Sequence, residues 1–477
     1  MNRFTDTTIC APATTPGTGA ISVIRISGPD ALAIADKVVS CRRGTLSDAP
    51  GYSVRFGCVY APDSVLVDEV LVSVFRAPHS YTGEDSVEIS CHASRYIVET
   101  ILGLLTEAGA AVAMPGEFTQ RAFVNGKMDL AQAEAVADLI SSQSSASHRI
   151  AMNQLKGGFS SELRTMRDAM LKIVSLMELE LDFSEEDVEF ADRSELMDLV
   201  DRTVAHCDKL VESFRLGNAI KNGIPVAIVG ATNTGKSTLL NALLGEDRAI
   251  VSDIAGTTRD TIEETLNIDG ILFRFIDTAG IRGTEETIER IGIERTFKKV
   301  SEAQVVLAMI DASDDETSGA TSSDALNQLS GDARSIATII SANQYCLFIL
   351  NKVDKCSKED INKKVRDLNT FVNSPVIQMS AKNGDGIELL ISELTSFAKK
   401  MVSDSDTTLV TNLRHVQELS ETSSSLRRAK DGLLNGVPSD LVSQDIREAI
   451  YHLGSIVGEI STDEVLGNIF SKFCIGK

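Results

Sequence analysis

The sequence predicts a multidomain fold: an α/β P-loop domain of Ras-like type, inserted into an all-α helical domain and preceded by an N-terminal α+β domain. The 477 residues exceed what one ordinary core holds. A phosphate-binding loop, residues 230–237, lies mid-chain between a strand-like run and a helix-like run. Helical periodicity on both sides of this block favours an insertion, because inserted domains have neighbouring ends. We therefore expect domain boundaries at 1–125, 126–222, 223–399 and 400–477.

The first block reads as strands with one clear helix. Strand-like runs occupy 20–26, 54–60, 70–75 and 87–91, and a helical pattern follows at 97–105. From Asp129 the pattern becomes helical, with apolar residues at helical spacing from Leu163 to Leu181. After the polar stretch 403–408, one apolar helical face runs from Ile446 to Ile460. The apolar stripe then continues through Val465, Leu466, Ile469 and Phe470, which predicts that the chain end docks.

Composition narrows the functional classes. The N-terminus lacks a basic region followed by an apolar stretch, and no run reaches about 18 apolar residues, so neither a secretory signal nor a membrane span is expected. The eight cysteines form no C-x-x-C pair, which argues against structural zinc and favours reduced thiols in a cytoplasmic protein. The net charge of −22 means that an RNA substrate requires a local basic surface or a basic partner.

The central loop reads Gly-Ala-Thr-Asn-Thr-Gly-Lys-Ser. In a strand–loop–helix context its N–H groups can wrap nucleotide phosphates, Lys236 can reach the β- and γ-phosphates, and Ser237 can hold magnesium. The motif alone leaves open a glycine-rich turn without a ligand.

Three further motifs, each after a strand-like run, specify GTP. The first ends in Gly280, whose N–H can bind the γ-phosphate, and begins with an aspartate that can hold magnesium through water. The second ends in Asp354, whose carboxylate can accept from both guanine N–H donors, which adenine does not present. The third resembles the loop that contacts the guanine oxygen. The motifs are Asp277-Thr278-Ala279-Gly280, Asn351-Lys352-Val353-Asp354 and Ser380-Ala381-Lys382.

The residues that would sense the γ-phosphate depart from the Ras pattern. Thr258 stands where GTPases ligate magnesium, but Ile281 occupies the position of the water-orienting glutamine. Glu289 is the candidate replacement, and a solvated helix charge is the alternative. Asn233 can ligate a monovalent cation in place of an arginine finger, or can simply stabilise its own turn.

The predicted GTP-binding residues come from five segments. They are Asn233, Thr234, Gly235, Lys236, Ser237, Thr238, Ser252, Asp253, Ile254, Ala255, Gly256, Thr257, Thr258, Asp277, Thr278, Ala279, Gly280, Asn351, Lys352, Val353, Asp354, Ser380, Ala381 and Lys382.

Four further stretches of the sequence, together with the GTPase motifs, carry a resemblance to a known family. They are Thr82-Gly83-Glu84-Asp85, Pro115-Gly116-Glu117-Phe118-Thr119-Gln120-Arg121-Ala122-Phe123, Asp129-Leu130-Ala131-Gln132-Ala133-Glu134-Ala135 and the terminal Phe473-Cys474-Ile475-Gly476-Lys477. With the GTPase motifs, they resemble the MnmE (TrmE) family of tRNA-modification GTPases over essentially the whole chain.

The resemblance implies a homodimer whose N-terminal domain binds 5-formyl- or 5,10-methylene-tetrahydrofolate. It implies a flavin- and NADH-dependent partner, MnmG (GidA), with which an aminomethyl-type group is installed at C5 of the wobble uridine of certain tRNAs. It also implies GTPase domains that dimerise across the nucleotides and require potassium.

The resemblance also assigns residues by position. Potassium ligands would be Asn233, Ser252, Ile254 and Thr257; magnesium ligands would be Ser237 and Thr258; folate contacts would be Arg25, Glu88, Lys127 and Lys477; and catalytic residues would be Lys236, Glu289 and Cys474. Glu289 would position the attacking water. The role of Cys474 stays open between nucleophile, structural thiol and bystander.

The chain departs from the family pattern at three places. Thr15-Pro16-Gly17-Thr18-Gly19 replaces Pro-Pro-Gly-Arg-Gly, His92-Ala93-Ser94 replaces His-Gly-Gly, and the phosphate loop lacks a proline. The first two bear on folate affinity and not on the fold. Physical pattern alone also permits a strand-face ion pair between Arg25 and Glu88. Two other functions stay open: a GTPase switch in ribosome or RNA assembly, and a folate-dependent transferase regulated by nucleotide.

Overall fold

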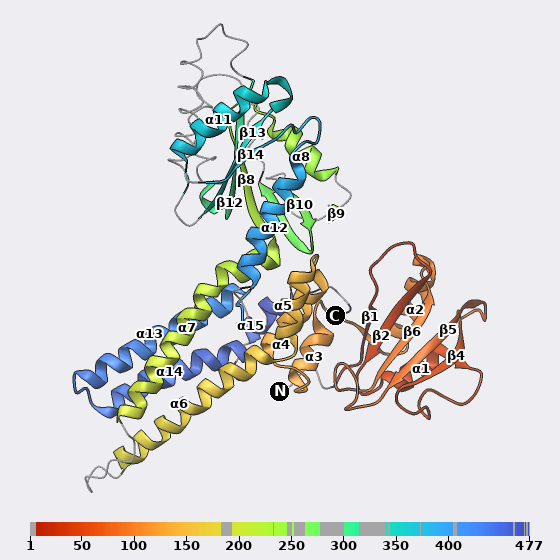
Figure 1. The fold of residues 1–477 in the computed structure, drawn as a ribbon. Coiled ribbons are helices and arrows are strands. Elements are labelled where there is room, and N and C mark those ends of the chain that lie inside the picture. Colours follow the sequence, from red (N-terminus) through yellow and green to blue (C-terminus); the bar gives the residue numbers. More distant parts are fainter. Residues whose placement is uncertain are drawn as a thin grey trace, which may run out of the picture. The chain divides into compact units, whose positions relative to one another are not determined.

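The computed structural model (Figure 1) describes residues 6–182, 193–231, 233–245, 250–251, 263–276, 300–313, 340, 344–372, 374–403, 408–460, 463–471, 473 and 476. The chain divides into two compact units. The first comprises Met1–Ala137, Asn153–Val204 and Glu421–Lys477, and the second comprises Asp138–Met152 and Ala205–Ser420.

The first unit contains a seven-stranded sheet in the order β3-β4-β5-β6-β2-β1-β7. Neighbouring strands in this sheet pair antiparallel, except that β1 and β7 pair parallel. The strands are β1 (Ile9–Pro12), β2 (Ile21–Ser27), β3 (Val39–Cys41), β4 (Ser53–Tyr60), β5 (Leu66–Phe75), β6 (Ser86–His92) and β7 (Ala111–Val112). The four strand-like runs of the sequence are confirmed as β2, β4, β5 and β6.

Alternation along these strands gives the sheet two different faces. One face packs on α1 (Ala31–Val38) and α2 (Arg95–Glu107), with Ile24, Val72 and Ile89 almost fully buried against helix residues. The other face carries Arg25 and Glu88 near its centre and exposes large apolar side chains on β4 and β5.

Further helices complete the described part of this unit. They are α3 (Glu117–Val124), α4 (Leu130–Ser141), α6 (Gly158–Asp182), α7 (Arg193–Asn222), α13 (Leu413–Leu434), α14 (Ser439–Val457) and α15 (Asp463–Phe470), of which α4, α7 and α13 continue into the second unit. Helices α6 and α14 lie side by side (Figure 1) and bury the predicted apolar stripes against each other.

The predicted helical face up to Ile460 is wrong at its end. Helix α14 stops at Val457, because Gly458 adopts a left-handed φ of 81° and its N–H bonds the carbonyl of Gly454. Ile460 therefore lies beyond the helix.

The second unit is built on a sheet in the order β14-β13-β12-β8-β11-β10-β9. The strands are β8 (Ile224–Val229), β9 (Ile250–Val251), β10 (Glu263–Ile268), β11 (Ile271–Ile276), β12 (Val305–Asp311), β13 (Tyr345–Asn351) and β14 (Val376–Gln378). From β11 through β14 neighbouring strands are parallel, and β10 pairs antiparallel with β9 and β11. The hairpin turn between β10 and β11 contacts the start of α5 (Ser145–Leu155). The Ala146 N–H donates there to the Gly270 carbonyl.

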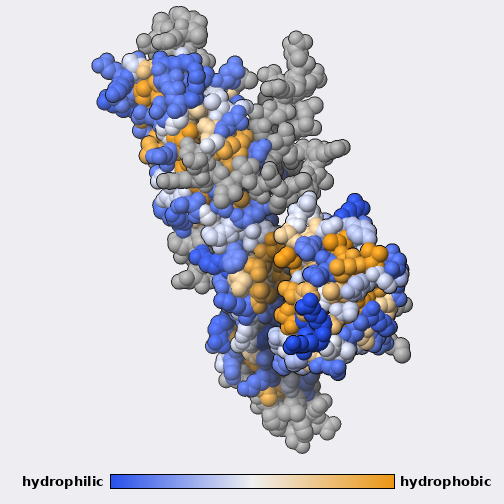
Figure 2. All heavy atoms as spheres, turned by 90° about the vertical axis from the view of Figure 1, so that its right-hand side faces the viewer, coloured by the Kyte–Doolittle hydropathy of each residue, from blue (hydrophilic) through white to orange (hydrophobic). Residues whose placement is uncertain are grey.

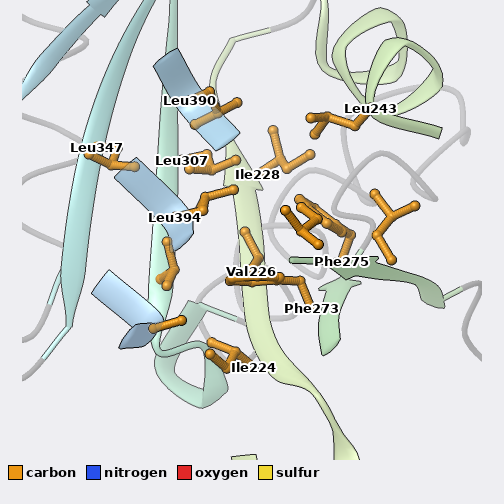
Figure 3. Packing of buried hydrophobic residues seen from close by; sticks show 14 of the residues in the cluster. Ile224, Val226, Ile228, Leu243, Phe273, Phe275, Leu307, Leu347, Leu390 and Leu394 are labelled. Atoms are coloured by element: carbon orange, nitrogen blue, oxygen red, sulfur yellow. The ribbon is translucent and has the colours of Figure 1, made fainter. Parts of the chain in front are cut away.

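Helices cover both faces of this sheet. Val226 and Ile228 of β8 point toward α8 (Lys236–Leu244) and α12 (Ile387–Ser403), as Figure 3 shows. The alternate residues Ala227 and Val229 pack with α11 (Lys358–Phe371) on the other face. The parallel strands β8, β12, β13 and β14 therefore end at one common edge, where ligands bind in folds of this kind.

Among the helices in the described part of the chain, none combines the length and the apolar character that crossing a membrane requires.

Candidate functional site

The phosphate loop connects β8 to α8 through two close approaches of the backbone. A Cβ on Gly230 would lie 2.4 Å from the carbonyl oxygen of Met309, and one on Gly235 would lie 2.3 Å from Asn351 Nδ2. Gly235 also adopts a φ of 101°. Only glycine satisfies both demands, so the loop closes tightly at the carboxyl edge of the sheet.

Lys236 and Ser237, which we expect to bind phosphate and magnesium, are the first two residues of α8. The Lys236 ammonium donates to the carbonyls of Gly230 and Ala231, both at 2.8 Å, and so lies within the loop itself. Ser237 and Thr238 are exposed in the first turn of α8. An exposed hydroxyl at this position fits the magnesium ligand predicted for Ser237.

Asn233 has a φ of 65° and an exposed side chain. Asparagine tolerates this left-handed conformation better than other residues with a Cβ, which supports its role in the turn. The exposed amide is also available to a cation, so the potassium role stays a prediction.

Asn351 joins the phosphate loop to the guanine side of the site. Its side chain is 2% exposed. Nδ2 donates to the carbonyl of Thr234 at 2.7 Å, and Oδ1 accepts from the N–H of Ala381 at 3.0 Å. One buried amide therefore fixes three motif segments relative to one another.

Asp354 lies three residues after Asn351, in the short 3-10 helix Val353–Lys355. Its carboxylate is exposed and accepts a hydrogen bond of 2.6 Å from the hydroxyl of Ser380, which is fully buried. This contact orients the carboxylate that we expect to read guanine. Ala381 is buried and Lys382 is exposed beside it.

Lys352 shows a partner that sequence reasoning missed. Its ammonium forms an ion pair with Asp311, the last residue of β12. Burial alone would raise the pKa of Asp311, but hydrogen bonds from Lys352 and Ser313 outweigh it and hold that pKa below its usual value. The available signal in the sequence was an aspartate at the end of an apolar run.

Several predicted site residues lie outside the described residues. They are Ser252, Asp253, Ile254, Ala255, Gly256, Thr257, Thr258, Asp277, Thr278, Ala279, Gly280, Glu289, Cys474 and Lys477.

The predicted folate contacts Arg25 and Glu88 are partners on adjacent strands. Arg25 Nε donates to Glu88 Oε1 at 2.9 Å, so the ion pair that pattern alone permits is present. The Arg25 guanidinium also lies 5.3 Å from the ring centre of Tyr81 and 5.6 Å from that of Phe118. Lys127 instead donates to the carbonyl of Pro78 at 2.9 Å.

Tyr81 was not predicted as a site residue. Burial raises the pKa of Tyr81, although a hydrogen bond to Thr119 and the charge of Arg25 act against the shift. The partly exposed phenol of Tyr81 and the fully buried ring of Phe118 both lie beside Arg25.

A buried ionic cluster joins two of the sequence motifs, 82–85 and 115–123. Arg121 is 1% exposed and contacts Glu117 at 2.9 Å, Glu84 at 3.1 Å and the Thr7 carbonyl at 2.8 Å. The motifs 82–85 and 115–123 are thus held together inside the N-terminal domain through Glu84, Glu117 and Arg121.

The chain end docks where it is described, as predicted. Phe470 and Phe473 are 2% and 8% exposed and pack with Leu130, Ala133 and Phe123. Gly476 has a φ of 92°, and a Cβ there would lie 2.1 Å from the carbonyl oxygen of Pro12, the last residue of β1. This end of the chain therefore lies against the strand that pairs with Arg25.

Two family models match the chain. Residues 8–127 match the model for the GTP-binding protein TrmE N-terminus, and residues 130–474 match the model for the MnmE helical domain.

Relatives that match nearly the whole chain belong to the same family as these models. The chain is 50% identical over 474 residues to a protein of Bacteroides fragilis (strain YCH46), covering 98% of this chain and 99% of that protein. It is 50% identical over 475 residues to one of Bacteroides thetaiotaomicron and 49% identical over 474 residues to one of Flavobacterium johnsoniae, with the same two coverages. Each of these relatives is named tRNA modification GTPase MnmE.

Proposed function

Because the chain belongs to the MnmE family of tRNA modification GTPases, we propose that it couples potassium-activated GTP hydrolysis to modification at C5 of the wobble uridine of certain tRNAs. The group installed is of the aminomethyl or carboxymethylaminomethyl type, and its carbon comes from a tetrahydrofolate one-carbon unit. The protein acts in the cytoplasm as a homodimer with the flavin-dependent MnmG (GidA) protein.

The observation that carries the GTPase part is the double hydrogen bond of Asn351. It ties the phosphate loop to Ala381, while Ser380 orients Asp354. A guanine base bound beside Asp354 would therefore meet groups that are already in place, which reduces the ordering cost of binding.

The chain's own residues then divide the work of hydrolysis. Lys236 shifts from two loop carbonyls to the phosphates, and the loop N–H groups hold the same oxygens. Magnesium, held by Ser237 and Thr258, would neutralise charge on the β- and γ-phosphates. Glu289 orients the attacking water, and Asn233 would help to hold a potassium ion, whose charge would serve in place of an arginine finger.

The outer face of the N-terminal sheet fits a folate. A folate offers a flat aromatic ring system and carboxylates, and this face offers the partly exposed ring of Tyr81 beside the half-buried Arg25. Glu88 fixes the guanidinium through the bond already described. We propose that Lys477, which follows Gly476 directly, pairs with a folate carboxylate and that Cys474 acts in the modification step.

The same sheet face supports the homodimer. Phe56 of β4 and Leu71 of β5 are cross-strand partners and are 36% and 52% exposed; Val54 is 59% exposed. Figure 2 shows hydrophobic residues gathered on the surface of this unit. Apolar side chains in such a cluster favour a covering partner, and we propose a second copy of the chain.

The acidic charge of −22 makes the flavin-dependent partner, or a local basic surface, the source of tRNA affinity in this proposal.

The guanine pocket is tested by Asp354→Asn. The amide presents a donor where guanine also presents one, so GTP affinity should fall at least about a hundredfold, while xanthosine triphosphate should bind. Titration with fluorescent GTP and xanthosine triphosphate measures both affinities.

The matched control for this experiment is Asp360→Asn. Asp360 is exposed in the first turn of α11 and bonds Ser357 there. This variant should keep wild-type preference. An unchanged GTP affinity in Asp354→Asn would show that the guanine pocket lies elsewhere.

A further inference from the structure

Asp311 is a buried carboxylate at the carboxyl end of β12, next to the guanine motif on β13. It is 7% exposed, and it is the register partner of Asn351 in the parallel ladder. Its Oδ1 accepts from Ser313 N at 2.9 Å and from Ser313 Oγ at 2.7 Å, and its Oδ2 binds the Lys352 ammonium.

The strand ladder does not need this ion pair. Residues Val305 to Asp311 already pair along the whole length of β13, and the N–H of Ala312 donates to the carbonyl of Asn351 at 2.8 Å. A neutral residue at 311 would leave those bonds intact. Burying a carboxylate is unfavourable unless it is paired. Because the ladder does not require Asp311, we look for its role in its partner, Lys352.

The lysine is held in an unusual conformation. Lys352 has a φ of 63°, a left-handed value that is strained for a residue with a Cβ. Along the chain it lies between Asn351, which is buried, and Asp354, which is exposed. The Lys352 side chain is 26% exposed, although its charged end is tied to Asp311. The four-carbon stem is therefore fixed while part of its surface stays open.

We propose that Asp311 is a positioning residue for nucleotide binding: it fixes the Lys352 stem as a preformed wall of the guanine pocket. A lysine stem offers an apolar surface to a flat base while its ammonium is bound elsewhere. Asp311 thus raises affinity for any purine nucleotide in this pocket, whereas Asp354 sets the preference for guanine. The inference rests on the proposed guanine pocket.

Asp311→Asn tests it. The Kd values of GTP and GDP should each rise about tenfold, the order expected when a lysine side chain must be ordered during binding. In steady-state hydrolysis the KM for GTP should rise by a similar factor with kcat unchanged. Ser313→Ala, which removes one hydrogen bond to the carboxylate, should raise Kd about threefold and is mild enough to fold.

The matched control is Asp201→Asn. Asp201 also binds a lysine ammonium, that of Lys430, but it lies on α7 in the first unit. Its nucleotide affinity should match wild type. Melting of the nucleotide-free proteins separates affinity from stability, because a purely structural aspartate would lower the melting temperature and leave Kd unchanged.

Two outcomes are distinguishable. If Asp311→Asn and Ser313→Ala both bind GTP with wild-type Kd while Asp354→Asn accepts xanthosine triphosphate, the pocket is right and the role of Asp311 is refuted. If Asp354→Asn does not change base preference, the pocket itself is wrong.

Discussion

Gly476→Ala perturbs the docked chain end with a single methyl group. Gly476 adopts a φ of 92°, where an alanine costs about 1–2 kcal/mol more than glycine. The new Cβ would also lie 2.1 Å from the Pro12 carbonyl oxygen, a backbone atom of β1 that cannot turn aside. A total cost of about 2 kcal/mol lowers the docked-to-undocked ratio about thirtyfold.

Two assays measure the effect of Gly476→Ala. Release of C-terminal residues by carboxypeptidase, monitored by mass spectrometry, should accelerate because the undocked end is accessible. Wobble-uridine modification with the flavoprotein partner should fall strongly, while potassium-stimulated GTP hydrolysis stays near wild type. Deletion of Cys474–Lys477 should abolish modification in the same selective way.

Gly467→Ala is the matched control. Gly467 lies within α15, and a Cβ there meets nothing within 4 Å. Alanine favours the helix by about 1 kcal/mol, so docking and modification should be unimpaired. Wild-type digestion and full modification in Gly476→Ala would refute the docking argument, and loss of both activities would indicate misfolding.

Further outcomes follow from the same structure. Sodium in place of potassium should slow hydrolysis about tenfold or more while nucleotide binding persists; equal rates would exclude the cation role. Glu289→Ala should lower kcat about a hundredfold at unchanged GTP affinity, and a normal kcat would make it a solvated helix charge. Arg121→Met should destabilise the N-terminal domain by about 3–5 kcal/mol in urea unfolding, because two carboxylates lose their buried partner; an unshifted midpoint would contradict the buried cluster. Gly270→Ala should cost more stability than Gly384→Ala: both have left-handed φ, but only the first places a Cβ against another group, 2.3 Å from Ser145 Oγ, and equal losses would argue against that contact.

The elements that sequence predicted well are long and strongly patterned. The alternating run 54–60 and the helical stripe from Leu163 to Leu181 each carry enough repeats to fix their period. Strands β1 and β7 span four and two residues, too few for a pattern, and were not predicted. Ile460 was placed in a helix because apolar spacing continued past the glycine that ends it.

The candidate site was predictable where chain order determines geometry. Motifs that follow parallel strands meet at one sheet edge, which brings Asn351 close to the phosphate loop. The roles of Asp311 and Arg121 depend on partners distant in sequence: Lys352 for the first, and Glu84 for the second. A single sequence contains such residues but does not show which distant partners they contact.

The central claim is that GTP hydrolysis by this chain serves tRNA modification. The most direct measurement is nucleoside analysis of tRNA from cells that lack the protein and are complemented with wild type or with Lys236→Ala. We predict that the C5-modified wobble uridine disappears without the protein, returns with wild type and does not return with Lys236→Ala. An unchanged nucleoside profile in cells lacking the protein would contradict the account and favour a GTPase switch in ribosome or RNA assembly.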